Sequence, residues 1–261
     1  MSSLVEEIVD YDIQHIPTLL ECLASRDSQE MLLQWNLDSS LKVEKFRFTG
    51  TFVPSNQGDY ERLLNKFFKS GEAMKVLGIT GSMENSNNNN NNINIIKHEQ
   101  LSTTVMSMDF FDRLNDDVCP NGYIRGCFEE TYDGIIVQDK LRELMLNPDS
   151  ENSCIYSDKD RNQYIYNIFK LLVVGGSLCQ PETKIDRYLN MTKGLYKDTL
   201  TVYKQAKNDE ITTAGKVFSI KEVAGLTLFN DSNSPHNVLY LVVDPMKKHI
   251  LSLKFDYKSF W

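Results

Sequence analysis

The sequence is short of the features that define several large classes of protein. Cations are outnumbered: 28 Lys and Arg stand against 36 Asp and Glu, which gives a formal net charge of −8. Proteins that hold nucleic acid without regard to its sequence need clustered cations to displace counterions, so we expect no nucleic-acid partner. Long apolar runs are also missing. The most apolar stretches, 171–174 and 238–243, are far shorter than the roughly 20 residues that cross a bilayer, so no membrane insertion is expected.

Cysteine is scarce, and the residues that are present form no framework. Cys22, Cys119, Cys127, Cys154 and Cys179 are an odd number at irregular spacing, which is typical of free thiols in a reducing compartment. No Cys-x-x-Cys or His-x-x-x-His pair occurs, so the sequence predicts no metal site. The first residues are acidic and include no apolar signal core. We therefore expect a cytoplasmic protein and not a secreted one.

Phosphate-binding and nucleophile motifs are absent as well. Gly175 and Gly176 follow a helical pattern, lack the Lys-Ser/Thr of a phosphate loop and do not match Gly-x-Gly-x-x-Gly. The Gly-x-Ser-x-Gly of a nucleophile elbow does not occur there either. We therefore predict no cofactor and no catalytic residues.

One alternative with catalytic activity stays open, a small cytosolic thiol-dependent enzyme that uses Cys179. Such an enzyme needs a base beside the thiol, and the candidates are His236 and His249. His249 alternates with the apolar Leu251 and Leu253, which favours a satisfied histidine in a sheet. His236 lies in a polar loop, where we expect it to be exposed.

The remaining composition is that of an ordinary globular protein. Of 261 residues, 41% are hydrophobic, which is enough to bury a sizeable core. We predict a single globular domain over residues 1–261 with a flexible Asn-rich loop at 85–94. The six consecutive Asn at 87–92 offer little apolar area against the entropy of ordering them. Candidate strands on both sides, at 76–80 and from Ile95, would make this loop the tip of a hairpin.

Hydrophobic periodicity and capping residues predict helices before the Asn tract. Residues up to Asn36 are expected to form two short helices with Ser28 as a cap, and Asp59 is expected to cap a helix that Gly71 ends. Between these helices, 41–53 alternates like a strand whose apolar phase shifts, as a bulge or a bend would require.

After the tract, helical patterns precede a change to strand patterns. Short helices are expected at 107–114 and 138–146. Asp158 then opens a helix that ends at Gly175-Gly176, and Pro181 opens a second helix, so the pair forms a central αα-hairpin. Strands are expected at 216–223 and 226–229, and 238–243 and 248–255 form a C-terminal β-hairpin around a type I turn at 244–247. The prediction is an α+β fold with helices packed on a mainly antiparallel sheet.

Four stretches of the chain are similar, in amino-acid sequence and in their order, to stretches of one known family. They are QWNLDSSLKVEKFRF around Trp35, SMDFFDRLNDD from Ser107, GGSLCQ with the later LYKD, and VVDPMKKHI from Val242. Together they resemble the cilia- and flagella-associated protein 300 family over most of the chain, from Leu32 onward.

That resemblance implies a function that the residue patterns do not give by themselves. Family members are non-enzymatic cytosolic interaction proteins that assist assembly or transport of the outer and inner axonemal dynein arms of motile cilia and flagella. The implied partners are dynein preassembly factors and axonemal dynein chains, and the implied location is the cytoplasm and also the axoneme. Gly175, Gly176, Cys179 and Gln180 are family-signature positions, which we interpret as a tight helix-to-helix corner or as a partner-facing surface.

The last four residues, 258–261, end in two aromatic side chains. They would serve either as a tail that docks on a partner or as a last strand that tucks Phe260 into the edge of the sheet.

Overall fold

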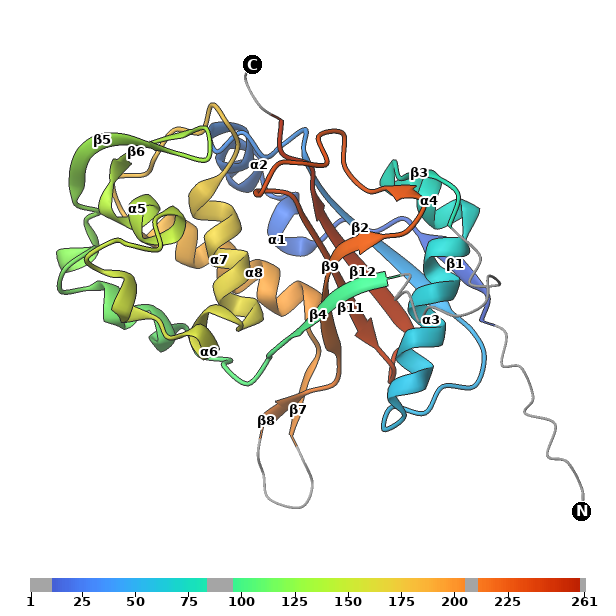
Figure 1. Cartoon of the computed structure of the whole chain (residues 1–261). Coiled ribbons are helices and arrows are strands. Elements are labelled where there is room, and N and C mark those ends of the chain that lie inside the picture. Colours follow the sequence, from blue (N-terminus) through green and yellow to red (C-terminus); the bar gives the residue numbers. More distant parts are fainter. Residues whose placement is uncertain (1–10, 84–95, 205–210, 259–261) are drawn as a thin grey trace, which may run out of the picture.

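The structure is a computed structural model that describes residues 11–83, 96–204 and 211–258. The Asn-rich loop expected at 85–94 and residues 259–261 of the aromatic tail lie outside these described ranges. Within them, helices surround an antiparallel sheet (Figure 1), so the α+β prediction is confirmed.

The elements before residue 102 are β1 Ile13–Ile16, α1 Glu21–Ala24, α2 Arg26–Gln34, β2 Leu41–Phe48, α3 Gln57–Lys69, α4 Gly71–Leu77, β3 Thr80–Gly81 and β4 Ile96–Leu101. The middle of the chain forms the 3-10 helices η1 Met108–Leu114, η2 Pro120–Gly122 and η3 Ser153–Ile155, the strands β5 Gly126–Tyr132 and β6 Ile135–Asp139, and the helices α5 Lys140–Leu146, α6 Asp158–Arg161, α7 Tyr164–Val174 and α8 Asp186–Thr199. The remaining strands are β7 Val202–Lys204, β8 Ile211–Thr213, β9 Lys216–Val223, β10 Leu226–Thr227, β11 Val238–Asp244 and β12 His249–Phe255.

The main sheet has six strands in the described residues, in the order β1-β2-β12-β11-β9-β4, and every neighbouring pair is antiparallel. Strands β11 and β12 form the predicted C-terminal hairpin. Asp244 stabilises its turn by accepting hydrogen bonds from the backbone N–H groups of Met246 and Lys247, each at 3.0 Å. The predicted hairpin is therefore confirmed.

The two faces of the sheet bury two separate hydrophobic clusters. Helices α5, α7 and α8, with α1 and α2, cover the face that we call the large face, and α3 and α4 cover the small face (Figure 1). Side chains alternate between them: Leu251, Leu253 and Phe255 of β12 lie in the large-face cluster, whereas Ile250 lies in the small-face cluster. Helices α7 and α8 pack against each other, as the predicted αα-hairpin requires.

This two-sided burial corrects the prediction of a bulge in 41–53. Strand β2 pairs with β12 without a register shift from Leu41 to Arg47. The apolar phase changes because Leu41 and Val43 pack on the large face while Phe46 and Phe48 pack on the small face. A strand with both faces covered shows such a phase change without any irregularity.

The Asn tract does not connect a hairpin. Residues 76–77 belong to helix α4, and the strand that follows, β3, pairs with β10 in a small sheet. Beyond the tract, β4 pairs instead with β9 in the main sheet. The two segments that flank the tract therefore lie in different sheets, which local sequence could not reveal.

Several predicted caps are displaced by a few residues. Ser25 caps α2 in place of Ser28, Asn56 caps α3 in place of Asp59, and Ser157 caps α6 in place of Asp158. In each case a polar side chain upstream accepts the orphan N–H groups of the first turn. Pro181 lies before α8 and outside it.

The expected strand at 226–229 is limited to Leu226–Thr227. Helix α3 buries one face, which includes Tyr60, Leu63, Leu64, Phe67 and Phe68. Among the described residues, no helix has both the length and the apolar character needed to cross a membrane.

Candidate functional site

The family-signature segment, 175–180, forms the corner at which α7 ends against the C-terminal end of α2. The Gly176 N–H donates to the Trp35 carbonyl at 2.9 Å, and the Gln180 N–H donates to the Gln34 carbonyl at 3.0 Å. Gly175 has φ of 63° and ψ of −158°, a conformation that strongly favours glycine. Backbone hydrogen bonds therefore join two helices that are far apart in the sequence.

Both glycines are needed for this close approach. A Cβ atom on Gly175 would lie 2.7 Å from the Trp35 carbonyl oxygen, and one on Gly176 would lie 2.4 Å from the Asn36 carbonyl oxygen. Backbone atoms cannot move aside as the end of a flexible side chain can. The signature glycines thus determine how closely α2 and α7 pack.

Arg142 of α5 connects this corner to the rest of the large face. Its side chain is almost fully buried, its Nε donates to the Val173 carbonyl at 3.1 Å, and its Nη2 contacts Cys179 Sγ. Asp139 caps α5 by accepting from the Arg142 N–H at 2.8 Å. Burial raises the pKa of Asp139, an effect that the nearby Arg142 opposes. The arginine thus joins α5 to the end of α7 and to the signature segment through buried polar contacts.

A second group of polar side chains holds the outer edge of the corner. Trp35 Nε1 donates to Glu182 Oε1 at 3.0 Å, and Arg187 Nη1 donates to the same oxygen at 2.8 Å. Arg187 also donates to Gln34 Oε1 at 2.9 Å, while the rings of Trp35 and Tyr188 lie 4.8 Å apart. These contacts tie the loop after the signature to α2 and to α8.

The environment of Cys179 does not favour nucleophilic chemistry. Burial raises the pKa of this thiol to about 11, although Arg142 opposes the shift, so the thiol is protonated at neutral pH. His236 and His249 are not among its hydrogen-bonding partners in the described ranges. The structure therefore brings Cys179 together with a buried arginine and not with either candidate base.

Both histidines differ from what their sequence context indicates. His236 is half-buried: its Nε2 donates to the Asp133 carbonyl at 3.1 Å and its ring lies 4.9 Å from that of Tyr257. Burial lowers the pKa of His236. His249 lies in β12 as expected, but its buried Nδ1 has no hydrogen-bond partner in the part of the chain that the structure describes. The expected exposed and satisfied histidines are both corrected.

The outer surface of the corner is partly apolar. Leu178 is 61% exposed and Leu33, on the neighbouring turn of α2, is 66% exposed. With Gln34 and Gln180 they line an open groove beside the signature. The four signature positions are thus divided: Gly175 and Gly176 are buried, Cys179 is half-buried and Gln180 is exposed.

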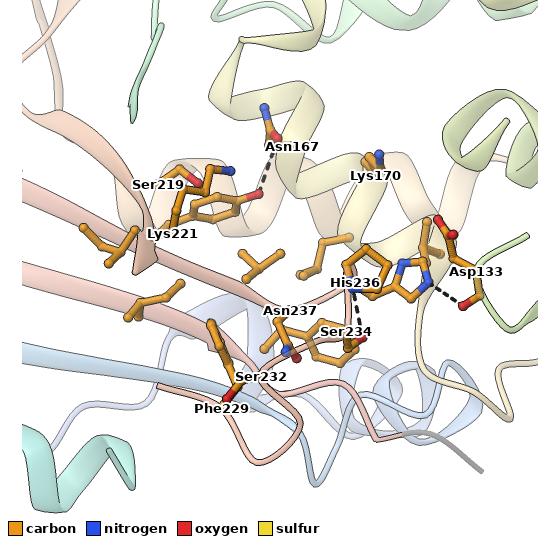
Figure 2. A pocket seen from close by; sticks show the side chains of 18 of the residues that line it. Asp133, Asn167, Lys170, Ser219, Lys221, Phe229, Ser232, Ser234, His236 and Asn237 are labelled. Carbon is orange, nitrogen blue, oxygen red and sulfur yellow. Dashed lines mark hydrogen bonds between the residues drawn. The ribbon is translucent and has the colours of Figure 1, made fainter. Parts of the chain in front are cut away.

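A more enclosed pocket of about 420 Å³ lies elsewhere on the large face, between α7, the strands β9 and β11, and the loop that precedes β11. Figure 2 shows Asn167 and Lys170 of α7 on one side, Lys221 of β9 on another, and His236 facing Asp133. We call it the α7 pocket. Its volume falls in the range of small-molecule sites, about 300–1,000 Å³.

Sequence patterns gave one usable sign of the α7 pocket. Helix α7 reads YIYNIFKLLVV, and Asn167 and Lys170 are its only non-aromatic polar residues. Their spacing of three places both on one side of the helix. The sequence around Lys221 and Arg142 does not indicate their roles, because their surroundings depend on which distant strands and helices pack together.

Metal ligation finds no support in the described ranges, where no group of three or more His, Cys, Asp or Glu side chains is placed to hold an ion. The five cysteines all lie in these ranges and are all free thiols.

Comparison with known proteins gives a consistent result over almost the whole chain. The family model described as "Cilia- and flagella-associated protein 300" matches residues 10–255. A protein of that name from Paramecium tetraurelia is 32% identical over 240 residues, which covers 92% of this chain and 91% of the relative. One from Chlamydomonas reinhardtii is 29% identical over 244 residues, covering 89% and 92%. No solved structure matches the chain significantly.

Proposed function

This chain belongs to the cilia- and flagella-associated protein 300 family, and from that premise we propose that it is a non-enzymatic interaction protein for axonemal dynein arms. In this proposal it assists the assembly or transport of the outer and inner arms of motile cilia and flagella. It acts in the cytoplasm and also enters the axoneme. The observation that carries the proposal is the family match from residue 10 to residue 255, which includes the signature segment and, apart from Tyr257, both hydrophobic clusters.

The signature corner supplies a surface suited to such a role. Leu33 and Leu178 are exposed side by side in one open groove, yet the backbone beneath them is fixed by the bonds from Gly176 and Gln180 to α2. Exposed apolar side chains on rigid elements are favourable for binding, because little conformational entropy is lost on association. We propose that this groove contacts dynein preassembly factors or axonemal dynein chains.

The thiol-enzyme alternative has weaker support. The raised pKa of Cys179 leaves little thiolate at neutral pH, and a thiol without a lowered pKa or an adjacent base is a weak nucleophile. The same buried contact with Arg142 accounts for Cys179 as a packed residue of the corner.

The test is affinity purification of the tagged protein from cells that are building motile cilia, followed by mass spectrometry. We expect enrichment of dynein heavy and intermediate chains and of chaperone cofactors over an unrelated bait. The variant Leu33→Glu/Leu178→Glu should lose these proteins, since two charges would face the apolar partner surface. Met246→Glu is the matched control, because Met246 is 77% exposed in the distant β11–β12 turn.

The outcomes distinguish the proposed function from the proposed contact surface. If the wild-type protein enriches none of these partners, the assembly proposal is wrong. If the wild-type protein and the leucine variant enrich them equally, the function stands and the groove is not the contact.

A further inference from the structure

We propose that the α7 pocket binds a small organic anion, whose anionic group is held between Lys170 and Lys221 and whose apolar body lies against α7 and β11. The inference is independent of the dynein-arm proposal, because it concerns a different part of the large face.

The first argument is uncompensated positive charge. Lys170 is half-buried and forms no ion pair with a carboxylate in the described residues. Asp133 attracts it from a distance, while Arg161 and Lys221 repel it. Burial and these repulsions lower the pKa of Lys170. An anion placed beside Lys170 would relieve this unfavourable environment, since a partly buried cation is stabilised chiefly by a close partner of opposite charge.

The second argument is the way in which Lys221 reaches the pocket. In the pairing of β4 with β9, Lys97 faces Glu222 but His98 faces Ile220, so Lys221 is an extra residue in the strand. This is a β-bulge, a feature that redirects a side chain and that is enriched next to binding sites. Lys221 is exposed, so it can meet an anion at the mouth.

The third argument is that the pocket has both a polar and an apolar part. Asn167, Ser219, Ser232 and Ser234 add amide and hydroxyl groups to the lining. In the view of Figure 2, Asn167 and Ser219 lie toward the two lysines, and Ser232 and Ser234 lie in the loop that precedes β11. The rest of the lining includes Leu171, Val174, Val238 and Phe255. The lining is divided about evenly between polar and apolar residues. Such a mixed lining suits a ligand that has both an anionic group and an apolar body.

Charge favours an anion over a cation or a neutral ligand. The pocket holds two lysines against one carboxylate, Asp133. His236 is held in its neutral form by burial, and its Nε2 hydrogen is already donated to the Asp133 carbonyl. Lys binds phosphate or carboxylate as a point charge.

Titration calorimetry of the full chain tests the proposal. The probes are phenyl phosphate and benzoate, which combine a ring with an anion, inorganic phosphate, which lacks the ring, and benzyl alcohol, which lacks the charge. We expect one of the two ring-bearing anions to bind at least tenfold more tightly than inorganic phosphate or benzyl alcohol. Whichever anion binds better identifies the ligand as a phosphate or a carboxylate.

Matched variants locate the binding. Lys170→Met and Lys221→Met should each weaken binding of the better probe about tenfold. Lys193→Met should leave it within twofold, because Lys193 lies exposed on α8 and outside the pocket. Far-UV circular dichroism verifies that each variant is folded, and Lys221→Met alone suffices if Lys170→Met does not fold.

A chemical measurement on the wild-type protein requires no variant. Acetic anhydride should acetylate Lys170 and Lys221 several-fold more slowly when the better probe is present, while Lys193 should react at an unchanged rate. The proposal is overturned if no probe binds at 10 mM, if Lys170→Met and Lys221→Met bind as the wild type does, or if Lys193 is protected equally.

Discussion

A buried lysine, Lys254, and a half-buried one, Lys170, lie on opposite faces of the central sheet and differ in how their charge is accommodated. On the small face, Lys254 donates to the Leu77 carbonyl at the end of α4 at 3.0 Å, and its Nζ lies 3.6 Å from Asp256. On the large face, Lys170 has no ion-pair partner in the described ranges. A buried charge that stabilises the fold is paired or hydrogen-bonded within the protein. The difference therefore indicates that Lys254 stabilises the structure and that Lys170 binds a ligand.

The two faces also differ in how their layers are assembled. The small face is built around α3 and α4, which are adjacent in the sequence and begin at caps that lie immediately before them. The large face joins α2, α5, α7 and α8 through contacts such as Gly176 with Trp35 and Arg142 with Val173. Its stability therefore depends more on long-range polar and backbone contacts, and the same substitution should have unequal effects on the two faces.

Glycine substitutions should give the largest contrast. Gly176→Ala forces a Cβ against the Asn36 carbonyl, and overpacking of this kind costs about 3 kcal/mol. Gly71→Ala, in the first turn of α4, has nothing within 4 Å of its Cβ and should stabilise the protein by about 0.5 kcal/mol. Urea unfolding followed by circular dichroism measures both, and a Gly176→Ala variant as stable as the wild type would refute the close-packed corner.

Removing one arginine from each face should give the next largest contrast. Arg142→Met leaves the Val173 carbonyl without its donor in a buried layer, so we expect a loss of about 3 kcal/mol. Arg62→Met removes a half-exposed arginine beside Asp59, for which about 0.5 kcal/mol is expected. Equal losses in chemical unfolding would show that the large face does not depend on its buried arginine.

The two lysines provide a third test. Lys254→Met should destabilise the protein by about 2 kcal/mol, because the Leu77 carbonyl and Asp256 lose a buried partner. Lys170→Met should change the free energy of unfolding by no more than about 1 kcal/mol, and in the stabilising direction. A Lys170→Met variant as damaged as Lys254→Met would mean that both lysines are structural.

The pH dependence of the Lys170→Met effect follows from the sign of the pKa shift. The pKa of Lys170 is lowered from the ordinary value of 10.5 by burial, so the unfolded chain binds this proton more tightly than the folded one. In the pH range between the folded and unfolded pKa values, the titration of Lys170 therefore increases the free energy of unfolding of the wild-type protein as the pH rises. The advantage of Lys170→Met should be fully present near pH 7, should decline as the pH rises toward 10.5, and should vanish above that pH.

The rates at which the cysteines are alkylated test the thiol-enzyme alternative, and this measurement perturbs the structure least. With iodoacetamide at pH 8, Cys154, which is exposed, should react first. Cys179 should react far more slowly, because a pKa of about 11 leaves about one thiolate in a thousand at pH 8. Cys22, whose pKa is raised to about 12, should also be slow. If Cys179 reacted fastest, the thiol-enzyme alternative would regain support.

Most elements could be predicted from the sequence because local patterns determine them. The apolar stripe of α3, the apolar run of α7 and the Asp-Pro turn between β11 and β12 each depend on neighbouring residues only. The αα-hairpin and the C-terminal hairpin follow from the order of such elements.

The errors came from contacts between distant segments. The pairing of β3 with β10 instead of β4, and the burial of both faces of β2, depend on which parts of the chain meet. The same limit applies to the sites. Sequence similarity to the family identified the signature segment. The contact of Arg142 with Cys179 and the presence of Lys170 and Lys221 in one pocket could be found only in the three-dimensional structure.

The most direct test of the proposed function is deletion of the gene in its own host, with electron microscopy of axoneme cross-sections. We expect axonemes that lack outer and inner dynein arms, and we expect the wild-type gene to restore them. Axonemes with a full set of both arms in the deletion strain would contradict the account.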